Sequence, residues 1–249
     1  MYKYLFCSSF LWLSIQLVIC QNVKDTLVSF FNFKVVASYQ LPAMDLAKRF
    51  GSHATVGGEI AYKNMQNWLW SAYTTITFGK KIRELNHLQN LWTSQNTIIG
   101  VDGRNAAISR YHRGYQMGIQ AAKIFSRIGG VNPNCGLFVQ GGIGYIQHKI
   151  RIETIGNTVY DLNKGSVEGY DRLCGGLMLN QGVGYLFLDN NRLANFFVLL
   201  ECIQGFTRSL RKIQYDVPNP DLRTRIDMAL GLKIGYMLAF YTKIEKDYY

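Results

Sequence analysis

Apolar side chains alternate with small, polar or charged ones over long stretches of the chain, most clearly near its C-terminus. From Ile226 to Phe240 every second residue is apolar, and the residues between them are mostly Ala, Gly, Lys or Asp. Successive side chains of a strand point to opposite faces, so this period predicts one strand of about 17 residues. Strands of globular sheets average about 5–6 residues. The length therefore favours a strand that crosses a membrane.

The same alternation recurs in seven stretches further upstream. They cover residues 31–40, 54–62, 68–79, 114–121, 137–145, 173–185 and 195–203. One face of each stretch is apolar. In the stretch 173–185, Gln181 places an amide on that face. Together the eight stretches predict an all-β protein: an eight-stranded antiparallel transmembrane up-and-down β-barrel, with lipid outside and a lumen inside.

The connections between these stretches alternate in length. The longer ones are 42–51, 81–109, 154–170 and 210–223, and the shorter ones are 64–66, 127–134 and 189–193. Long extracellular loops and short periplasmic turns are typical of outer-membrane barrels. An even number of strands then places both chain ends in the periplasm. We expect residues 31–249 to form a single barrel, after a periplasmic N-terminal segment at 21–30.

Residues 1–20 have the pattern of a secretory signal peptide. Lys3 precedes an apolar run from Tyr4 to Ile19, and we expect cleavage before Gln21. Two alternatives are a membrane anchor, for which the run is short, and lipidation of Cys20 after removal of the preceding residues. We therefore expect export to the outer membrane of a Gram-negative bacterium.

Inward-facing charges on the predicted strands form a candidate lumen network. Its members are Lys34, Glu59, Glu201, Lys233 and Asp227. Strand adjacency pairs Lys34 with Glu59, and Lys233 with Glu201, and a buried charge is costly without a partner. Asp227 is expected nearer the outer rim, where Arg225 or a loop would be its partner. The network is interpreted as a packed ionic plug, with a gated narrow path or a proton relay as alternatives.

Basic residues are concentrated in the predicted extracellular loops. The chain has 27 Lys and Arg against 16 Asp and Glu, a net charge of +11. The candidate contact residues are Arg104, Arg110, Arg113, Arg208, Arg211, Lys212 and Arg223. Arginine binds phosphate through two parallel hydrogen bonds, so outer-membrane lipid and lipopolysaccharide are expected partners, with a specific acidic partner as the alternative. Export argues against nucleic-acid binding.

Catalytic, metal and cofactor sites are not expected. Outside the leader, Cys135, Cys174 and Cys202 form neither a disulfide framework nor a zinc motif. Nothing in the sequence pairs Ser109 with His112 as nucleophile and base, and the other histidines lie near strand ends: His53, His87 and His148. Apolar residues at roughly helical spacing in 82–92 predict a short amphipathic segment that folds over the barrel mouth or docks a neighbouring protein.

The chain from Gln21 onward resembles the small outer-membrane β-barrel proteins of Bacteroidota-type bacteria, including the PorT-like and PorG-like barrels. The resemblance lies in that glutamine, the Asp-Leu-Ala-Lys-Arg-Phe-Gly segment at 45–51 and the glycine-rich strand at 138–145. It extends to the barrel of OmpA-like proteins but not to their peptidoglycan-binding domain, since only residues 243–249 follow the last expected strand.

The resemblance implies a non-enzymatic anchor or accessory subunit of an envelope machine for secretion or assembly, such as type IX secretion and gliding. The alternatives are a stand-alone narrow pore or surface-binding protein, and, more distantly, a lipid-modifying enzyme of the outer membrane. These classes differ in what they require: a stoichiometric partner, conductance or ligand binding by the isolated barrel, or lipid turnover.

Overall fold

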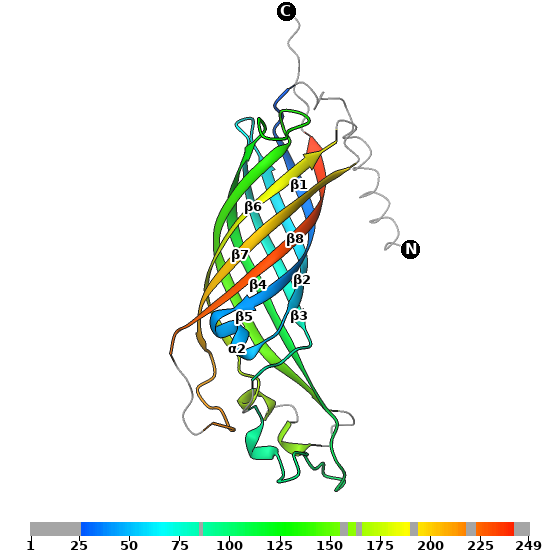
Figure 1. Cartoon of the computed structure of the whole chain (residues 1–249), viewed down its shortest axis with the longest axis vertical. Helices are drawn as coiled ribbons and strands as arrows, with labels where there is room; N and C mark the ends of the chain where they lie inside the picture. The colour runs from blue at the N-terminus through cyan, green and yellow to red at the C-terminus, as the bar shows by residue number, and fades with distance from the viewer. Residues whose placement is uncertain are drawn as a thin grey trace, which may run out of the picture.

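Eight antiparallel strands close into a barrel in the computed structural model, which describes residues 26–84, 87–154, 159–162, 166–189, 194–217 and 223–241. Each strand pairs with its neighbour in the chain, and β8 closes the barrel against β1 (Figure 1). The strands are β1 Phe30–Ala43, β2 His53–Lys63, β3 Trp68–Gly79, β4 Ile108–Phe125, β5 Gly136–Thr154, β6 Cys174–Leu188, β7 Asn195–Ser209 and β8 Arg225–Tyr241. The predicted signal peptide, and residues 21–25 of the segment after it, lie outside the described residues.

The alternation of side chains gives the barrel an apolar outside and a filled inside. Along β1 the burial alternates strictly from Phe30, which is buried, through Phe31, which is exposed, to Asn32, which is buried. The predicted all-β, eight-stranded antiparallel barrel is therefore confirmed. No helix in the described part of the chain has the length and apolar character needed to cross a membrane.

The two ends of the barrel differ in their connections, as Figure 1 shows. One end, here called the turn end, carries the start of β1, the end of β8 and short turns such as Asn64–Asn67 between β2 and β3. In that turn the Asn64 side chain accepts hydrogen bonds from the backbone of Gln66 and of Trp68. The other end, here called the loop end, carries the helix α2 (Met44–Arg49) and the long connections.

Among the eight strands, β4 and β5 exceed the lengths predicted from the sequence by the most. β4 and β5 pair over 18 consecutive residues, from Ile108↔Thr154 to Phe125↔Leu137. Their outer halves are rich in His, Arg and Lys, so the apolar alternation fades there although the backbone ladder continues. The ladder depends on backbone hydrogen bonds, which a polar sequence forms equally well. These halves extend past the apolar surface and support the loops.

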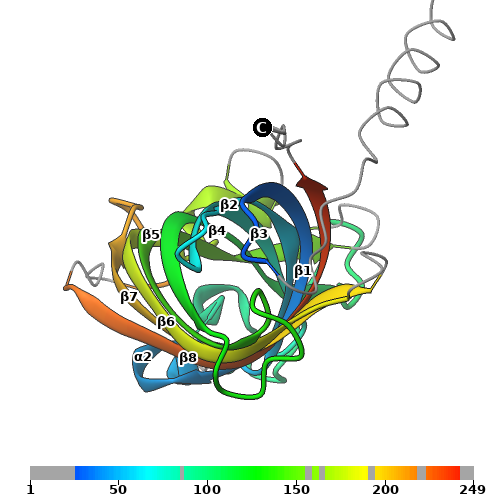
Figure 2. The ribbon, with the colours of Figure 1, turned by 90° about the horizontal axis from the view of Figure 1, so that it is seen from above.

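Figure 2 shows the ribbon in a view along the barrel axis. Side chains fill the interior of the barrel. An apolar cluster at the turn end includes Phe30, Leu69, Phe138, Leu186 and Phe197. A second cluster toward the loop end contains Leu46, which lies in α2, and Phe50, which directly follows α2. An eight-stranded barrel has an interior just wide enough to be filled by side chains.

A third cluster joins the long connections to one another. It contains Leu88, Ile98, Val159, Leu162 and Tyr170, which come from residues 80–84, 87–107, 159–162 and 166–173. We call the ordered assembly of these segments with residues 210–217 the loop cap. The described residues of the amphipathic segment predicted in 82–92 are helical only in one 3-10 turn, Gln89–Leu91. Leu88 adopts a φ of 65°, and this left-handed backbone cannot continue a helix.

Candidate functional sites in the lumen and the loop cap

Two ion pairs lie inside the barrel, each between adjacent strands. Lys34 Nζ on β1 lies 2.5 Å from Glu59 Oε1 on β2, and the register pairs the two residues directly. Lys233 Nζ on β8 lies 2.5 Å from Glu201 Oε2 on β7. All four side chains are buried. Each of these two cations is thus in direct contact with one carboxylate.

Neutral groups and aromatic rings complete the surroundings of these pairs. Glu201 Oε1 accepts hydrogen bonds from Ser38 Oγ at 2.6 Å and from Gln40 Nε2 at 2.7 Å. The ammonium group of Lys34 lies over the ring of Phe197, and that of Lys233 over the ring of Tyr73. Each of the two ammonium groups therefore has both a carboxylate and an aromatic face as partners. The cluster links β1, β2, β3, β7 and β8 across the lumen.

Asp227, the fifth predicted member of the lumen network, lies apart from these pairs. Its Oδ2 atom is 2.8 Å from His148 Nε2 on β5 and accepts a hydrogen bond from Thr207 Oγ1 at 2.5 Å. The sequence predicted Arg225 or a loop as its partner and did not indicate His148 or Thr207. The Arg225 guanidinium donates a hydrogen bond to Cys174 Sγ at 3.0 Å. β5 lies across the barrel from β8, so strand adjacency could not reveal the contact with His148.

Three histidines gather around Phe50 near the loop end. The His112 ring stacks on Phe50 with centroids 3.8 Å apart, and the rings of His53 and His148 approach His112 edge-on at 4.8 and 5.8 Å. These residues were predicted at separate strand ends, and the cluster was not predicted. The signal was available: each occupies an inward position at the loop end of its strand. Among the described residues no group of His, Cys, Asp and Glu is arranged to hold a metal ion.

A network of ion pairs stabilises the loop cap, and Arg172 is at its centre. Its guanidinium contacts Glu84 Oε1 at 2.8 Å, Asp216 Oδ1 at 2.9 Å and Gln214 Oε1 at 2.5 Å. Arg172 thereby connects all three segments of the cap. Arg49, at the end of α2, lies 3.5 Å from Glu84 and links the cap to the barrel mouth. None of these residues was a sequence candidate.

The predicted basic residues have different environments. Arg211 is held in the cap by Glu168 at 2.7 Å and by Asp171 at 2.8 Å. Arg113 lies against the rings of Phe78 and Tyr111, and Arg110 is partly buried below the cap. The remaining four are exposed: Arg104, Arg208, Lys212 and Arg223. The seven residues therefore do not form one continuous site.

We expect removal of the Arg172 side chain to open the cap without unfolding the barrel. Arg172→Ala leaves the buried Asp216 without its guanidinium partner and should destabilise the cap by about 2–3 kcal/mol. Limited proteolysis of folded protein is expected to cut residues 80–107 faster in this variant. Arg104→Ala, which removes an exposed arginine, should be cut at the wild-type rate. Equal rates for both variants would contradict the central role of Arg172.

Acidification is expected to loosen the cap in two steps. Burial lowers the pKa of His87 below its ordinary 6.5, and its Nε2 donates a hydrogen bond to the Tyr170 carbonyl in the neutral form. Burial raises the pKa of Glu84, but Arg49 and Arg172 outweigh burial and the net pKa lies below 4.5. Both residues bind protons more readily when the cap is open. The stability of the closed cap therefore falls as the pH drops below 6.5, because of His87, and falls again below 4.5, because of Glu84.

The proteolysis rate measured from pH 8 to pH 4 checks these two steps. His87→Gln keeps a side-chain donor for the Tyr170 carbonyl and should remove the upper step alone. A profile that is unchanged in His87→Gln would show that another group causes the loosening.

Ser109 and His112 do not form a nucleophile–base pair. They are three residues apart on β4, so their side chains lie on opposite faces of the strand. His112 is buried in the histidine cluster, where its neighbours are aromatic rings.

Comparisons with known proteins give weak similarities. No known protein family and no curated protein sequence matches the chain. Among solved structures, the Ail attachment invasion locus protein of Yersinia pestis aligns with 11% identity over 85% of this chain and 99% of its own, with a TM-score of 0.46. Neisserial surface protein A aligns with 12% identity over 84% and 96%, with a TM-score of 0.41. The N-terminal barrel of Pseudomonas aeruginosa OprF aligns with 13% identity over 83% and 97%, with a TM-score of 0.37.

The fold assignment rests on the strand pairs of this chain, which form one closed barrel. The resemblance to PorT-like and PorG-like barrels stays a prediction. What the structure establishes is a closed eight-stranded antiparallel β-barrel with an apolar outer surface, buried ion pairs in its lumen and a packed cap at one end.

Proposed function

We propose that the chain is a non-enzymatic β-barrel of the Gram-negative outer membrane, which anchors the loop cap as an accessory part of an envelope complex. The observation that carries the proposal is the exposed apolar surface around the whole barrel. It includes Val35 on β1, Ile60 on β2, Ile119 on β4, Leu200 on β7 and Leu238 on β8. A water-soluble monomer rarely exposes so large an apolar surface. Lipid is the environment that suits it.

Outward-facing aromatic residues support a membrane boundary near the turn end. Trp68 and Trp70 lie close to the start of β3 and are exposed, as are Phe31 on β1 and Tyr62 on β2. Aromatic girdles of this kind are found at both interfaces of outer-membrane barrels. The short turns at this end and the long loops at the other favour an orientation with the turn end in the periplasm and the loop end outside the cell.

Outward-facing cations near the loop end suit the phosphate groups of lipopolysaccharide. Arg113 on β4 pairs directly with Lys149 on β5, Arg151 follows on the same face, and Arg208 is exposed on β7. They lie above the apolar surface, at the level where lipid phosphates of the outer leaflet would be. Lys149 and Arg151 already have carboxylate partners, so contact with outer-membrane lipid and lipopolysaccharide is proposed for Arg113 and Arg208. Arg211, which is engaged within the cap, has a structural role instead.

The filled lumen favours an anchor over a pore. Lys34, Glu59, Glu201 and Lys233 are in direct contact, and apolar residues fill the turn end. We expect purified barrels in planar lipid bilayers to show no steady conductance above the bare membrane. A Lys233→Ala/Glu201→Ala double variant should admit water and conduct if it remains folded. Steady conductance of the wild-type barrel would instead favour the narrow-pore alternative.

The accessory role is tested by isolating a tagged copy from native envelopes in mild detergent. A defined partner recovered at near-equal stoichiometry, and lost when the cap residue Arg172 is replaced, would support an envelope complex. The resemblance noted from the sequence favours a secretion or assembly machine, including type IX secretion and gliding. A barrel recovered with lipid alone would contradict the accessory role and favour a stand-alone surface-binding protein.

A further inference from the structure

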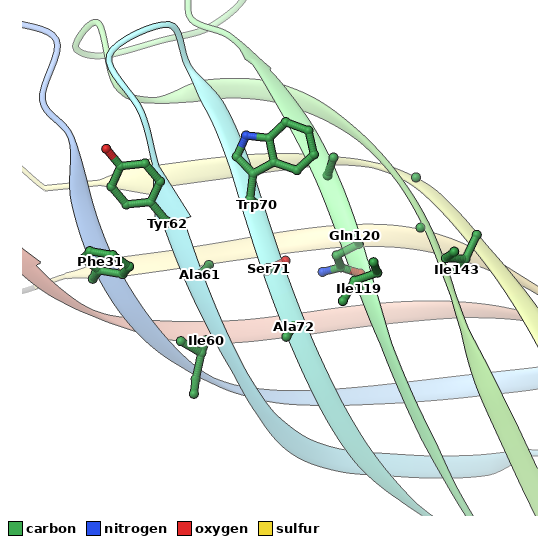
Figure 3. A pocket seen from close by; sticks show the side chains of 13 residues that line it. Phe31, Ile60, Ala61, Tyr62, Trp70, Ser71, Ala72, Ile119, Gln120 and Ile143 are labelled. Carbon is green, nitrogen blue, oxygen red and sulfur yellow. The ribbon is translucent and has the colours of Figure 1, made fainter.

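A hollow in the outer apolar surface lies beside a polar side chain on the same surface. The hollow has a volume of about 540 Å³ and lies over β2, β3, β4 and β5. Figure 3 shows Trp70, Ile119 and Ile143 around it, with Ala72 between Ile60 and Ile119. Its floor is made by three small outward residues on three neighbouring strands: Ala72, Ala121 and Gly141.

The glycine in this floor is not required by the barrel. A Cβ atom at Gly141 would have no other heavy atom within 4 Å, and the residue does not have a positive φ. At Gly142 and Gly144, by contrast, a Cβ would collide with backbone atoms inside the barrel. The barrel alone would therefore accept a large apolar residue at 141, as it does at Val139 and Ile143. The missing side chain leaves room for something outside the barrel.

The polar side chain is that of Gln181, directly opposite Gly141 in the register of β5 and β6. It is exposed on the apolar surface, and its amide makes no hydrogen bond to any part of the chain that the structure describes. Hydrocarbon offers an amide no partner, so an unpaired amide there costs free energy. Gln181 is seven residues from either end of β6, which places it near mid-depth of the barrel wall.

A protruding side chain next to a hollow fits a second copy of the same surface. A two-fold rotation about an axis between Gln181 and Gly141 puts the glutamine of each copy opposite the hollow of the other. An amide both donates and accepts hydrogen bonds, so the two glutamines can also pair across the axis. Small residues allow close approach of segments within a membrane, and hydrogen bonds between polar residues add to the association. Two-fold dimers are the commonest protein oligomers.

We propose that two copies of this barrel associate in the membrane through β5 and β6, with Gln181 and Gly141 at the centre of the interface. The inference rests on the membrane-spanning barrel proposed above and names a partner for it. The dimer leaves both lumens closed and places two loop caps side by side on the same side of the membrane.

Cysteine crosslinking in native membranes tests this interface. The native Cys202 on β7 pairs directly with Gln181 on β6. The test therefore uses a Cys202→Ser background. Gln181→Cys in that background should give a covalent dimer with a short bis-maleimide. The matched control is Ile76→Cys, which is exposed on the same apolar surface but on β3. Its dimer yield should be several-fold lower, because its side chain does not lie at the proposed interface. Equal yields, or no dimer from either variant, would overturn the proposal.

Filling the hollow provides the second test. Gly141→Leu should leave the fold intact, since its side chain enters open space, but should raise the dimer dissociation constant in lipid vesicles by about tenfold. Energy transfer between labelled copies measures this constant. Retention of the heat-resistant form in mild SDS shows that the variant is folded. An unchanged dissociation constant would contradict the interface.

The two proposals fail in different ways. A wild-type chain that does not insert into vesicles would refute the membrane barrel. A chain that inserts but transfers no energy would refute the dimer alone, and a lipid chain would then occupy the hollow.

Discussion

Replacing Glu201 with alanine is expected to lower the free energy of unfolding by about 3–5 kcal/mol, the usual cost of leaving a buried charge without its partner. The variant leaves Lys233 Nζ without the carboxylate that lies 2.5 Å away. It also removes the acceptor for Ser38 and Gln40. Unfolding in urea, followed by tryptophan fluorescence in vesicles, measures the change.

A double variant separates the effect of the two charges from the effect of the volume that the two side chains fill. Glu201→Leu combined with Lys233→Met removes both charges and keeps apolar volume, and should recover most of the lost stability. A loss of less than about 1 kcal/mol in Glu201→Ala would be typical of a solvated pair and would contradict a closed lumen.

An arginine in the middle of the outer apolar surface should destabilise the folded barrel by about 2–4 kcal/mol in vesicles. Leu200→Arg is suited to this test because Leu200 is 67% exposed and lies near the centre of β7. In a soluble protein the same change at an exposed leucine would have little effect. The measurement is again urea unfolding in vesicles.

The matched control for Leu200→Arg is Tyr160→Arg, at a residue of the cap that is 74% exposed. Its stability should stay within about 0.5 kcal/mol of wild type. If the two arginines had equally small effects, the apolar surface would not face lipid.

The strands could be predicted because each has one face toward the outside and one toward the interior. That constraint produces a period of two in the sequence of β8 from Ile226 to Phe240, and similar patterns in the other seven strands. Ion pairs between adjacent strands, such as Lys34 with Glu59, follow from the same reasoning once the strand order is known. The outer halves of β4 and β5 could not be predicted from this alternation, because their pairing continues above the apolar surface.

The contacts across the barrel could not be predicted in this way. The pairing of His148 on β5 with Asp227 on β8 depends on barrel curvature and on the depth at which each strand places its residues. The loop cap is harder still, because Glu84, Arg172 and Asp216 come from three separate connections with no periodic pattern. Their ion pairs depend on loop conformations that the sequence does not reveal.

Tryptophan fluorescence in vesicles of brominated lipid tests the central claim most directly, namely that the barrel wall faces lipid and the cap does not. The chain starting at Gln21 contains Trp68 and Trp70 on the outer surface of β3 and Trp92 in the cap. A Trp92→Phe variant reports on the barrel wall, and a Trp68→Phe/Trp70→Phe variant reports on the cap. The account predicts strong quenching by brominated lipid in the first variant and little in the second. Equal quenching in both variants, or none in the first, would contradict it.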